Sequence, residues 1–306
     1  MNNAQMMQST VGPLDRVEGL ITLAMPSISR PYRAQLASTV IAEARSHGWR
    51  VDMVVYQDEW GLSAEEYLDT RHGPCDGLLL YLVGDDTLSE RALTQPFPVV
   101  CMGPRRQTYG MADQVLADNV ADARNATELL ISAGSRRLVL LGAQAAFDGV
   151  AVDATRETTR GWERVRGVLE ACETHGVALD PALIGVTGNE WTIGAGYETM
   201  MRLARADAPF DGIVALNDQL AIGALFAMKM LGRDVPREVQ VVGFDNTFEG
   251  ERMVPPLTSV DSNITWIASA AVDLLSRRIH ERAAGYDVEA VRFQRESMIV
   301  LRGTTR

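Results

Sequence analysis

Short apolar segments alternate with helical segments along almost the entire chain. Gly19–Ala24 has the composition of a buried strand, and the helix that follows from about Tyr32 ends at His47-Gly48, where glycine accepts a left-handed conformation. The same unit recurs in Gly212–Leu216 and in the helix Asn217–Leu231 that follows it. Apolar strands separated by helices form parallel sheets that are covered on both faces. The alternation therefore predicts an α/β fold.

These segments are too numerous for a single doubly wound sheet. About ten strands and eight helices are expected from the apolar pattern, and the alternation restarts near Gly134. A chain of 306 residues can bury one large core or two ordinary ones. Because no segment rich in Pro, Gly or Ser separates the halves, we expect two doubly wound parallel-sheet lobes that pack against each other.

Charge and composition narrow the possible partners. Hydrophobic residues make up 46% and charged residues 23%, and no apolar run approaches the roughly 20 residues that span a bilayer. The first 15 residues carry no positive n-region and no apolar h-region, so we expect a cytoplasmic protein with no membrane partner. A net charge of -11 would repel a polyanion on average. This part of the protein is therefore not expected to contact DNA.

Sequence motifs for catalysis and metal binding are missing. The histidines at positions 47, 72, 175 and 280 form no His-Glu-x-x-His motif, and there is no Gly-x-Ser-x-Gly elbow or phosphate-binding loop. Gly194-Ala-Gly196 lacks a third glycine and is expected only to begin a helix. Cys75, Cys101 and Cys172 are widely spaced, as expected of buried thiols in a reducing compartment. We therefore expect a binding protein, not an enzyme, with no cofactor and no metal.

Two polar corners follow strands of the second half. Asn217 comes directly after a strand and opens a helix, and Asp245 comes directly after the strand VQVVGF. Asn217 is explained equally well as a helix N-cap or as a ligand-binding amide. Asp245 is either a turn residue or a carboxylate that accepts hydrogen bonds from ligand hydroxyls. Because ligands bind at the carboxyl ends of parallel strands, both corners are candidates for a binding site.

Two aromatic residues carry the same ambiguity. Trp191 lies in a loop ahead of a helix, and Tyr32 follows Ser27-Ile-Ser-Arg-Pro31 at the start of a helix. Either aromatic ring can belong to the core, or it can stack on the apolar face of a sugar or base.

Several blocks resemble the effector-binding core of lac/gal repressor-family regulators, and the resemblance covers nearly the whole chain. The most specific blocks are ALNDQLAIGAL, LGRDVPREVQVVGFDN and VPPLTSV, in the family's order and spacing. Earlier matching blocks are MPSISRPYRAQL, CDGLLL, PVVCMGPR and ADNVADARNATELLISAGSRRLVLLG. The resemblance implies two lobes of periplasmic-binding-protein type, joined by three crossing segments, that close on an effector.

The same resemblance implies a division of the chain and a set of ligand contacts. It divides the chain into a linker remnant or disordered segment (1–16), a first lobe (17–133 plus 263–291) and a second lobe (134–262 plus 292–306). The expected contacts are Ser27 and Tyr32 on the first lobe, Trp191 for stacking, Asn217 and Asp245 for hydrogen bonds, and Ser262 in a crossing segment.

The chain departs from the family pattern at two places. Family members carry an arginine three residues before the Gly-aromatic pair, which is Gly161-Trp162 in this sequence, but Thr158 holds that position between Arg156 and Arg160. We include Thr158 among the expected ligand contacts, and its identity disfavours an effector that needs a bidentate arginine clamp. In addition, only about 17 residues precede the first strand, and they show no helix-turn-helix pattern. We expect a core excised from a longer regulator rather than a standalone sensor.

These observations lead to one functional hypothesis and one alternative. The hypothesis is the effector-binding and dimerisation core of a bacterial transcription regulator, a homodimer that senses a sugar or sugar derivative by lobe closure. Operator DNA would be contacted only through a headpiece absent from this chain. The alternative is a solute-binding protein that delivers a sugar to a transporter, against which the missing export signal counts.

Overall fold

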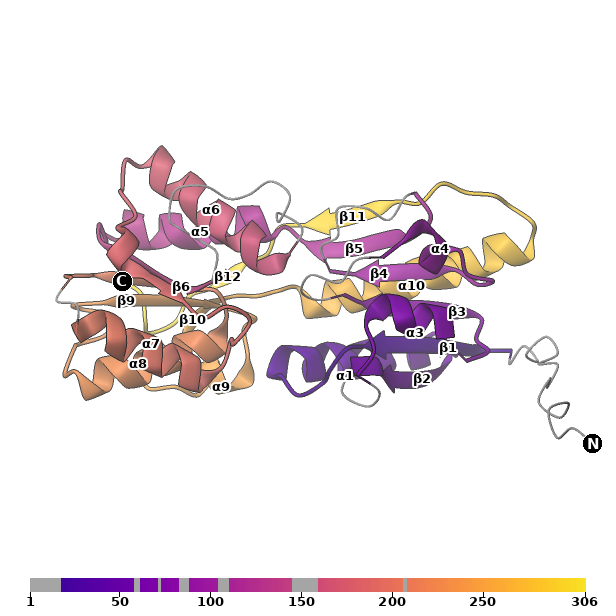
Figure 1. Cartoon of the computed structure of the whole chain (residues 1–306), viewed down its shortest axis with the longest axis horizontal. Helices are drawn as coiled ribbons and strands as arrows, with labels where there is room; N and C mark the ends of the chain where they lie inside the picture. Colours follow the sequence, from indigo (N-terminus) through magenta and orange to yellow (C-terminus); the bar gives the residue numbers. More distant parts are fainter. Residues whose placement is uncertain are drawn as a thin grey trace, which may run out of the picture.

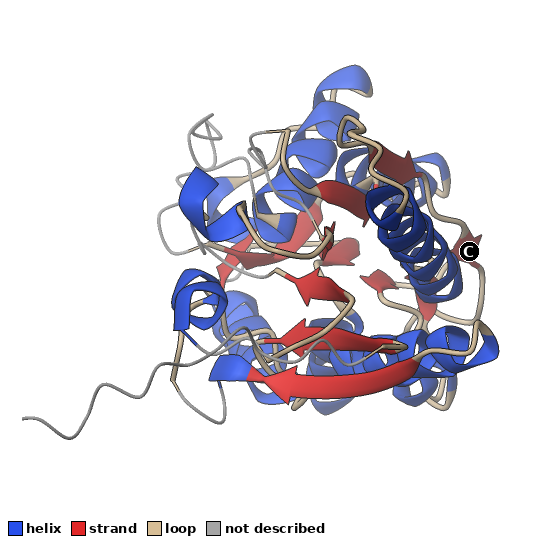
Figure 2. Ribbon diagram, turned by 90° about the vertical axis from the view of Figure 1, so that its right-hand side faces the viewer, coloured by secondary structure: helices blue, strands red, loops and turns tan. Residues whose placement is uncertain are grey.

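The computed structural model places the chain in two lobes, each built on a six-stranded sheet (Figure 1). The structure describes residues 18–57, 61–70, 73–82, 88–103, 110–144, 159–205 and 208–306. The expected linker segment 1–16 and Thr158 lie outside these ranges. Strands occupy the centre of each lobe and helices lie on both sides of them (Figure 2). The expectation of two doubly wound, mostly parallel lobes is confirmed.

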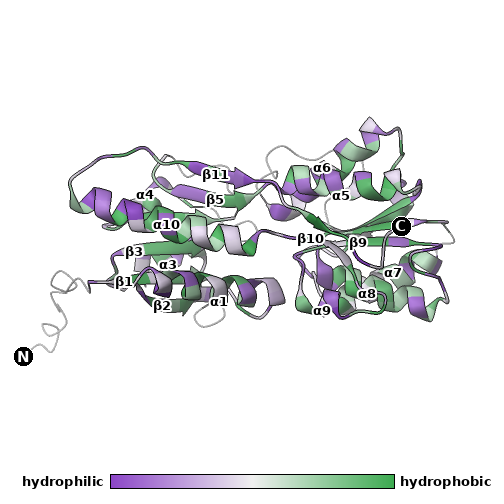
Figure 3. Ribbon diagram, turned by 180° about the vertical axis from the view of Figure 1, so that it is seen from behind, coloured by the Kyte–Doolittle hydropathy of each residue, from purple (hydrophilic) through white to green (hydrophobic). Residues whose placement is uncertain are grey.

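The first sheet consists entirely of parallel strand pairs. Its order is β11 (Arg292–Arg295), β5 (Asp113–Ala117), β4 (Val99–Met102), β3 (Gly77–Tyr81), β1 (Leu20–Met25) and β2 (Arg50–Val55). Apolar residues of α1 (Pro31–Ser46) and α10 (Ile264–Ala283) form one core on this sheet, and those of α3 (Ala64–Thr70) and α4 (Glu90–Leu93) form another. The central strands β1, β3 and β4 are mostly apolar and buried, whereas the edge strand β11, with the sequence RFQR, is hydrophilic and exposed (Figure 3). The helices carry both hydrophilic and hydrophobic residues, as helices that cover a sheet on one side require.

The second sheet is parallel except at one edge, where β12 pairs antiparallel with β10. Its order is β12 (Ile299–Val300), β10 (Thr258–Val260), β9 (Gln240–Phe244), β8 (Gly212–Ala215), β6 (Leu138–Ala143) and β7 (Ile184–Val186). One core involves α5 (Asn119–Ser132) and α6 (Arg160–Thr174), and the opposite one involves α7 (Ile193–Arg205) and α8 (Asp218–Met230). The short elements η1 (Pro181–Leu183) and α9 (Phe248–Glu251) precede β7 and follow β9.

Glycines allow the helices of the second lobe to pack closely. A Cβ atom on Gly167 of α6 would lie 2.2 Å from the Val120 carbonyl oxygen of α5, and one on Gly223 of α8 would lie 2.3 Å from the Ile193 carbonyl oxygen of α7. A Cβ atom on Gly196 would lie 2.5 Å from the Leu220 carbonyl oxygen. The fragment Gly194-Ala-Gly196 therefore lies at the start of α7, as expected, and its second glycine belongs to a helix–helix contact.

The chain crosses between the lobes three times, after β5, after β10 and after β11 (Figure 1). Hydrogen bonds join the crossings. The Ser297 backbone N–H and hydroxyl both donate to the Asp122 carboxylate, each at 2.6 Å. Asn263 Nδ2 donates to the Glu296 carbonyl at 3.0 Å. The three crossing segments thus form one connected hinge.

Two segments lie in a different lobe from the one expected from the sequence. Residues 119–132 form α5, which packs on α6 and on the second sheet because Gly167 lets the two helices approach closely. Residues 292–295 form β11, which extends the first sheet through pairing with β5. Strands β5 and β10 themselves were not among the strands expected from the apolar pattern, because they are short and contain polar residues.

Candidate functional site

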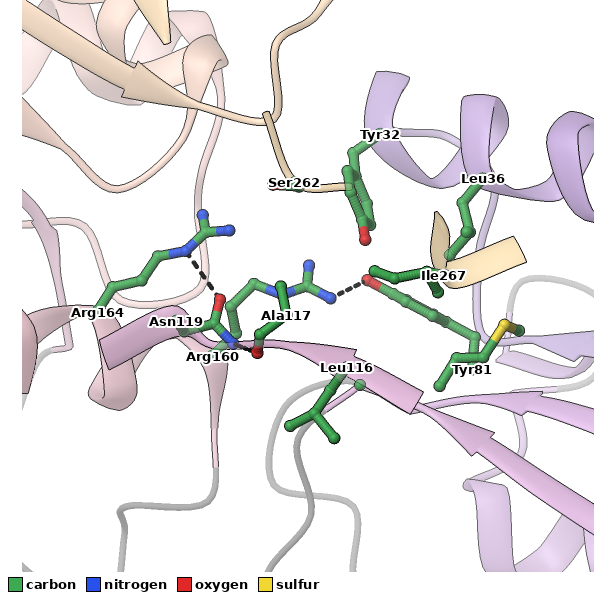
Figure 4. A pocket seen from close by; sticks show the side chains of 12 residues that line it. Tyr32, Leu36, Tyr81, Leu116, Ala117, Asn119, Arg160, Arg164, Ser262 and Ile267 are labelled. Atoms are coloured by element: carbon green, nitrogen blue, oxygen red, sulfur yellow. Dashed lines mark hydrogen bonds between the residues drawn. The ribbon is translucent and has the colours of Figure 1, made fainter. Parts of the chain in front are cut away.

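A pocket lies between the lobes and draws side chains from both of them and from a crossing segment (Figure 4). Its lining includes Tyr32 and Leu36 of α1, Tyr81 at the end of β3, Asn119 at the start of α5, Arg160 and Arg164 of α6, and Ser262 after β10. The cavity volume is about 10 Å³, room for one water molecule. A sugar therefore enters only if the lobes separate or the lining side chains move.

Arg160 joins the two lobes across this pocket. It stands at the first position of α6, whose N-cap is Thr159, with the Thr159 hydroxyl accepting from the Trp162 N–H at 3.3 Å. Arg160 Nη2 donates to the Tyr81 hydroxyl at 2.6 Å (Figure 4). Its guanidinium also lies 4.9 Å from the centre of the Tyr32 ring and 5.5 Å from that of Tyr81. The contact combines a hydrogen bond with cation–π attraction.

Arg164 lies one helical turn further along α6, on the same side of the helix. Its buried guanidinium donates to Asn119 Oδ1 at 3.2 Å, to the Leu216 carbonyl, and to Asp245 Oδ1 at 3.4 Å. Burial lowers the pKa of Arg164, and the Asp245 charge opposes that shift. This arginine is held by protein partners on every side where the structure describes contacts, so it supports the pocket wall.

Asp245 and Ser262 meet at the edge of the second sheet. Asp245 follows β9 with a φ of 100°, in the region that non-glycine residues seldom adopt. The Ser262 hydroxyl donates to Asp245 Oδ1 at 3.1 Å. Because Ser262 belongs to a crossing segment, this bond connects the corner after β9 to the hinge. The strained backbone at Asp245 is typical of residues in functional sites.

Asn217 and Trp191 form a second pair, on the α7–α8 side of the same lobe. Asn217 is the N-cap of α8: its Oδ1 accepts from the Leu220 N–H at 2.9 Å, while its Nδ2 donates to the Trp191 carbonyl at 3.3 Å. Trp191 Nε1 donates to the Gly142 carbonyl at 3.1 Å. A Cβ atom on Gly161 would lie 3.2 Å from the Trp191 ring, so a larger residue where α6 begins would press on the indole.

The expected site residues thus fall into separate places. Tyr32 and Ser262 line the pocket, and Asp245 is bonded to Ser262. Ser27 is buried and shares a 2.8 Å hydrogen bond with the Ser29 hydroxyl. Thr158 lies outside the described residues. The ligand contacts assigned to these residues, and to Trp191 and Asn217, stay predictions.

Several pocket residues were missed or underestimated from the sequence. Arg160, which flanks Thr158, was not included among the expected contacts, yet it lines the pocket. Arg160 and Arg164, four residues apart on a helix, share one face, and that spacing is a signal that could have revealed both. Tyr81, a polar aromatic residue ending an apolar strand, is a similar signal. Asn119 was not recognised as a site candidate, because the strand β5 that ends just ahead of it was not expected.

Asp218, in the first turn of α8, connects this helix to the loop after β9 and to β10. The buried carboxylate accepts from the Thr247 N–H at 2.7 Å, the Thr247 hydroxyl at 3.0 Å and the Ser259 hydroxyl at 2.7 Å. Burial, with the nearby Asp245 charge, raises the pKa of Asp218 to about 7. Asp218 therefore holds in place the loop that carries Asp245.

The residues described contain no group of three or more His, Cys, Asp or Glu side chains arranged to hold a metal ion. None of the helices described is both long enough and apolar enough to cross a membrane.

Comparison with known proteins gives consistent results. The sequence model of the periplasmic binding protein-like domain family matches residues 127–305 of this chain. The chain is 30% identical to a LacI-type transcription regulator from Bifidobacterium animalis subsp. lactis, with a TM-score of 0.80 over 94% of this chain and 100% of that one. It is 25% identical to a LacI family transcriptional regulator from Arthrobacter sp. FB24 solved in complex with lactose, with a TM-score of 0.78 over 94% of this chain and 99% of that one.

Among curated proteins, the chain is similar to the HTH-type transcriptional regulator CelR of Thermobifida fusca. The two are 29% identical over 77% of this chain and 64% of CelR. The chain therefore spans somewhat less than two thirds of that relative's length.

Proposed function

The chain belongs to the periplasmic-binding-protein-like family of LacI-type transcription regulators, and from that premise we propose that it is the effector-binding part of a ligand-responsive regulator. The observation that carries this proposal is the pocket between the lobes, which is closed by the contact of Arg160 with Tyr81. A ligand in this pocket must change that contact. Its binding is therefore coupled to the arrangement of the lobes, and it favours the arrangement for which it has the higher affinity.

We propose a sugar or sugar derivative as the effector. The similar regulator from Arthrobacter was solved with lactose. The pocket offers what a sugar needs: the aromatic rings of Tyr32 and Tyr81, and polar groups from Arg160, Asn119 and Ser262. Aromatic rings stack on the apolar faces of sugars, and the polar groups bind hydroxyls. The curated relative is a transcription regulator, which favours regulation over solute transport or catalysis.

The lobes that respond to this ligand follow the sheets. We propose a first lobe of residues 18–118 and 262–295 and a second lobe of 119–261 and 296–306. In a twofold dimer, a change in the angle between the lobes changes the distance between the two first lobes. That distance controls whether DNA-binding segments attached to them match two half-sites.

We propose that the dimer contact involves the second lobe near α8 and α9, which contact each other. Met230 on α8, Phe248 on α9 and Val254 after it are exposed apolar residues, with 68%, 66% and 92% of their surface accessible. Exposed apolar side chains on the surface of a lobe are candidates for protein–protein contacts.

Two measurements, made one after the other, test the proposed function. A thermal-shift screen of sugars, polyols and nucleosides should find a compound that stabilises this chain. That compound should then change the affinity of the full-length protein for its operator DNA. A stabilising compound with no effect on DNA binding is not the effector, and the failure of every compound would contradict the proposal.

A further inference from the structure

The side of the pocket that the first lobe forms is largely hydrocarbon. Within the described residues, its larger lining side chains are those of Tyr32, Leu36, Tyr81, Met102, Leu116 and Ile267. They come from α1, β3, β4, β5 and α10, and all but Leu116 also belong to the apolar core of this lobe. The two tyrosine hydroxyls supply the only oxygen or nitrogen atoms of these six side chains. We call Leu36, Met102, Leu116 and Ile267 the apolar wall.

The opposite side of the pocket is polar. In the part of the chain that the structure describes, its lining side chains are those of Asn119, Arg160 and Arg164 of the second lobe, with Ser262 of the crossing segment after β10. Figure 4 shows Leu36 and Arg164 on opposite sides of the Arg160 guanidinium. The amide and both guanidinium groups therefore come from one lobe and the aliphatic side chains from the other. The pocket is amphipathic across the lobe boundary.

In the present arrangement Arg160 covers part of the first-lobe side. The rings of Tyr32 and Tyr81 lie 6.3 Å apart, centre to centre, at an angle of 43°. The Arg160 guanidinium lies over both rings, and the remaining cavity is about 10 Å³. Because this cavity holds only one water molecule, a sugar enters when Arg160 moves away from the rings, with its lobe or by itself. Either movement opens the two rings and the apolar wall to the ligand.

Hydrocarbon and hydroxyl groups differ in what they gain at this surface. A methyl or aromatic group covers the wall and releases water, which is favourable in proportion to the apolar area buried. A sugar hydroxyl against the same wall loses its hydrogen bonds to water and meets carbon atoms, which costs free energy. A hydroxyl beside Asn119, Arg160 or Ser262 finds donors or acceptors instead. The pocket therefore favours a ligand with hydroxyls at one end and hydrocarbon at the other.

We propose that the effector is an amphipathic sugar whose hydrocarbon group lies against the apolar wall and whose hydroxyls face the second lobe. The hydrocarbon group is the methyl of a 6-deoxy sugar or the aromatic aglycone of a glycoside, since both place apolar surface next to a polyhydroxylated ring. Arg160, released from Tyr81, donates to the hydroxyls. This assignment rests on the proposed function of the pocket as an effector site.

Titration calorimetry on the whole chain with matched pairs of ligands tests this assignment. L-Rhamnose is compared with L-mannose, and L-fucose with L-galactose, because each pair differs only by the hydroxyl at carbon 6. Phenyl β-D-glucoside is compared with cellobiose, and phenyl β-D-galactoside with lactose, because these pairs share one sugar ring and differ in the polarity of the second ring. We expect the apolar member of at least one pair to bind roughly tenfold or more tightly. Phenol alone is the control for binding without a sugar.

Variants of one wall residue assign the preference to the apolar wall. Threonine and valine have nearly the same shape, so Ile267→Thr and Ile267→Val differ mainly by a hydroxyl. Ile267→Val should keep the preference for the apolar member, whereas Ile267→Thr should reduce it about threefold or more. Ile279→Thr, similarly buried on the same helix but outside the described lining, should keep the parent preference. A circular dichroism spectrum and a melting curve show that each variant is folded.

The outcomes separate the amphipathic ligand from the proposed function. If the polar member binds as tightly as its partner in every pair, the hydrocarbon group is wrong and the sugar site stands. The ligand comparison needs no variant, so it decides this point whether or not Ile267→Thr folds. If folded Ile267→Thr keeps the same preference as Ile267→Val, the apolar wall is not the contact surface and the assignment is contradicted.

The remaining outcomes identify the source of the hydrocarbon. A preference confined to the deoxy sugars identifies a methyl group, and one confined to the phenyl glycosides identifies an aglycone. If phenol alone binds as tightly as the phenyl glycosides, the apolar contact stands and the sugar is wrong. If no probe binds, both proposals are contradicted.

Discussion

Arg30 on the first lobe donates a 2.8 Å hydrogen bond to the main-chain carbonyl of Trp191 on the second. The bond spans the opening between the lobes on the α7–α8 side, while the contact of Arg160 with Tyr81 spans the pocket from the α6 side. Two arginines, one from each lobe, therefore hold the present arrangement of the lobes.

Removing the Arg30 contact should loosen the lobes without unfolding them. Arg30 is half-buried at the lobe boundary, so we expect Arg30→Ala to lower the free energy of unfolding by no more than about 1 kcal/mol. The radius of gyration of the free chain in small-angle X-ray scattering should increase. Arg45→Ala, on the same helix but exposed, should change neither quantity. An unchanged radius in Arg30→Ala would show that this bond does not restrain the lobes.

Truncating Trp191 should separate ligand binding from folding. Trp191→Ala should abolish ligand-induced thermal stabilisation while the circular dichroism spectrum stays native, since the indole packs against α6 at the site edge. The variant also loses the bond to the Gly142 carbonyl, so its melting temperature without ligand should fall. Stabilisation by the same sugar in Trp191→Ala would remove Trp191 from the binding site.

Arg164 should contribute more to the free energy of unfolding than an arginine on the exposed surface. Removing one partner of a buried ion pair leaves the other charge uncompensated, which typically costs about 3–5 kcal/mol. We expect urea unfolding of Arg164→Ala to show a loss near the lower end of this range, because Ser262 still donates to Asp245. Arg202→Ala, on the exposed surface of α7, should stay within about 0.5 kcal/mol of the parent chain.

Stability should fall as the pH rises from about 4 to about 7. Burial raises the pKa of Asp218 to about 7 and that of Asp122 to about 6. The folded chain therefore keeps protons that the unfolded chain has already released, and each raised pKa lowers stability with rising pH. In Asp218→Asn the slope of unfolding free energy against pH should be shallower over this range. The exposed Asp287→Asn should keep the parent slope, and an unchanged slope in Asp218→Asn would contradict the raised pKa.

Two glycines on neighbouring helices should respond to alanine with opposite signs. A Cβ atom on Gly223 would lie 2.3 Å from the Ile193 carbonyl oxygen, so Gly223→Ala should destabilise the second lobe by about 1–3 kcal/mol or more. A Cβ atom on Gly194 would meet nothing closer than the Thr192 hydroxyl at 4.0 Å. Gly194→Ala should therefore stabilise α7 by up to about 1 kcal/mol. Denaturant unfolding of both variants checks the pair.

The architecture could be predicted from the sequence because local patterns of apolar and capping residues determine where strands and helices form. Buried strands such as Gly77–Tyr81 and Val99–Met102 are continuous apolar runs, and caps such as Asn217 mark where helices begin. Strand β10, with the sequence TSV, carries too little apolar pattern to be recognised. The placement of α5 depends on a glycine contact with α6, 47 residues away from Val120, which no local pattern contains.

The site was predicted less completely for a related reason. Asn217 and Asp245 follow strands of one sheet, so their shared edge could be deduced from local sequence. The meeting of Arg160 with Tyr81 depends on how two lobes, connected by three crossings, face each other. The same is true of Arg30 and Trp191, which are 161 residues apart.

Lobe movement driven by ligand is the central claim, and one distance measures it. Spin labels on cysteines introduced at Arg45 of α1 and Glu198 of α7, both exposed, report the separation of the lobes, because the native cysteines are buried. Double electron–electron resonance is recorded with and without the sugar that stabilises the chain most. The account predicts a shifted distance distribution when that sugar is bound and no shift in Trp191→Ala. A saturating sugar that leaves the distribution unchanged would contradict it.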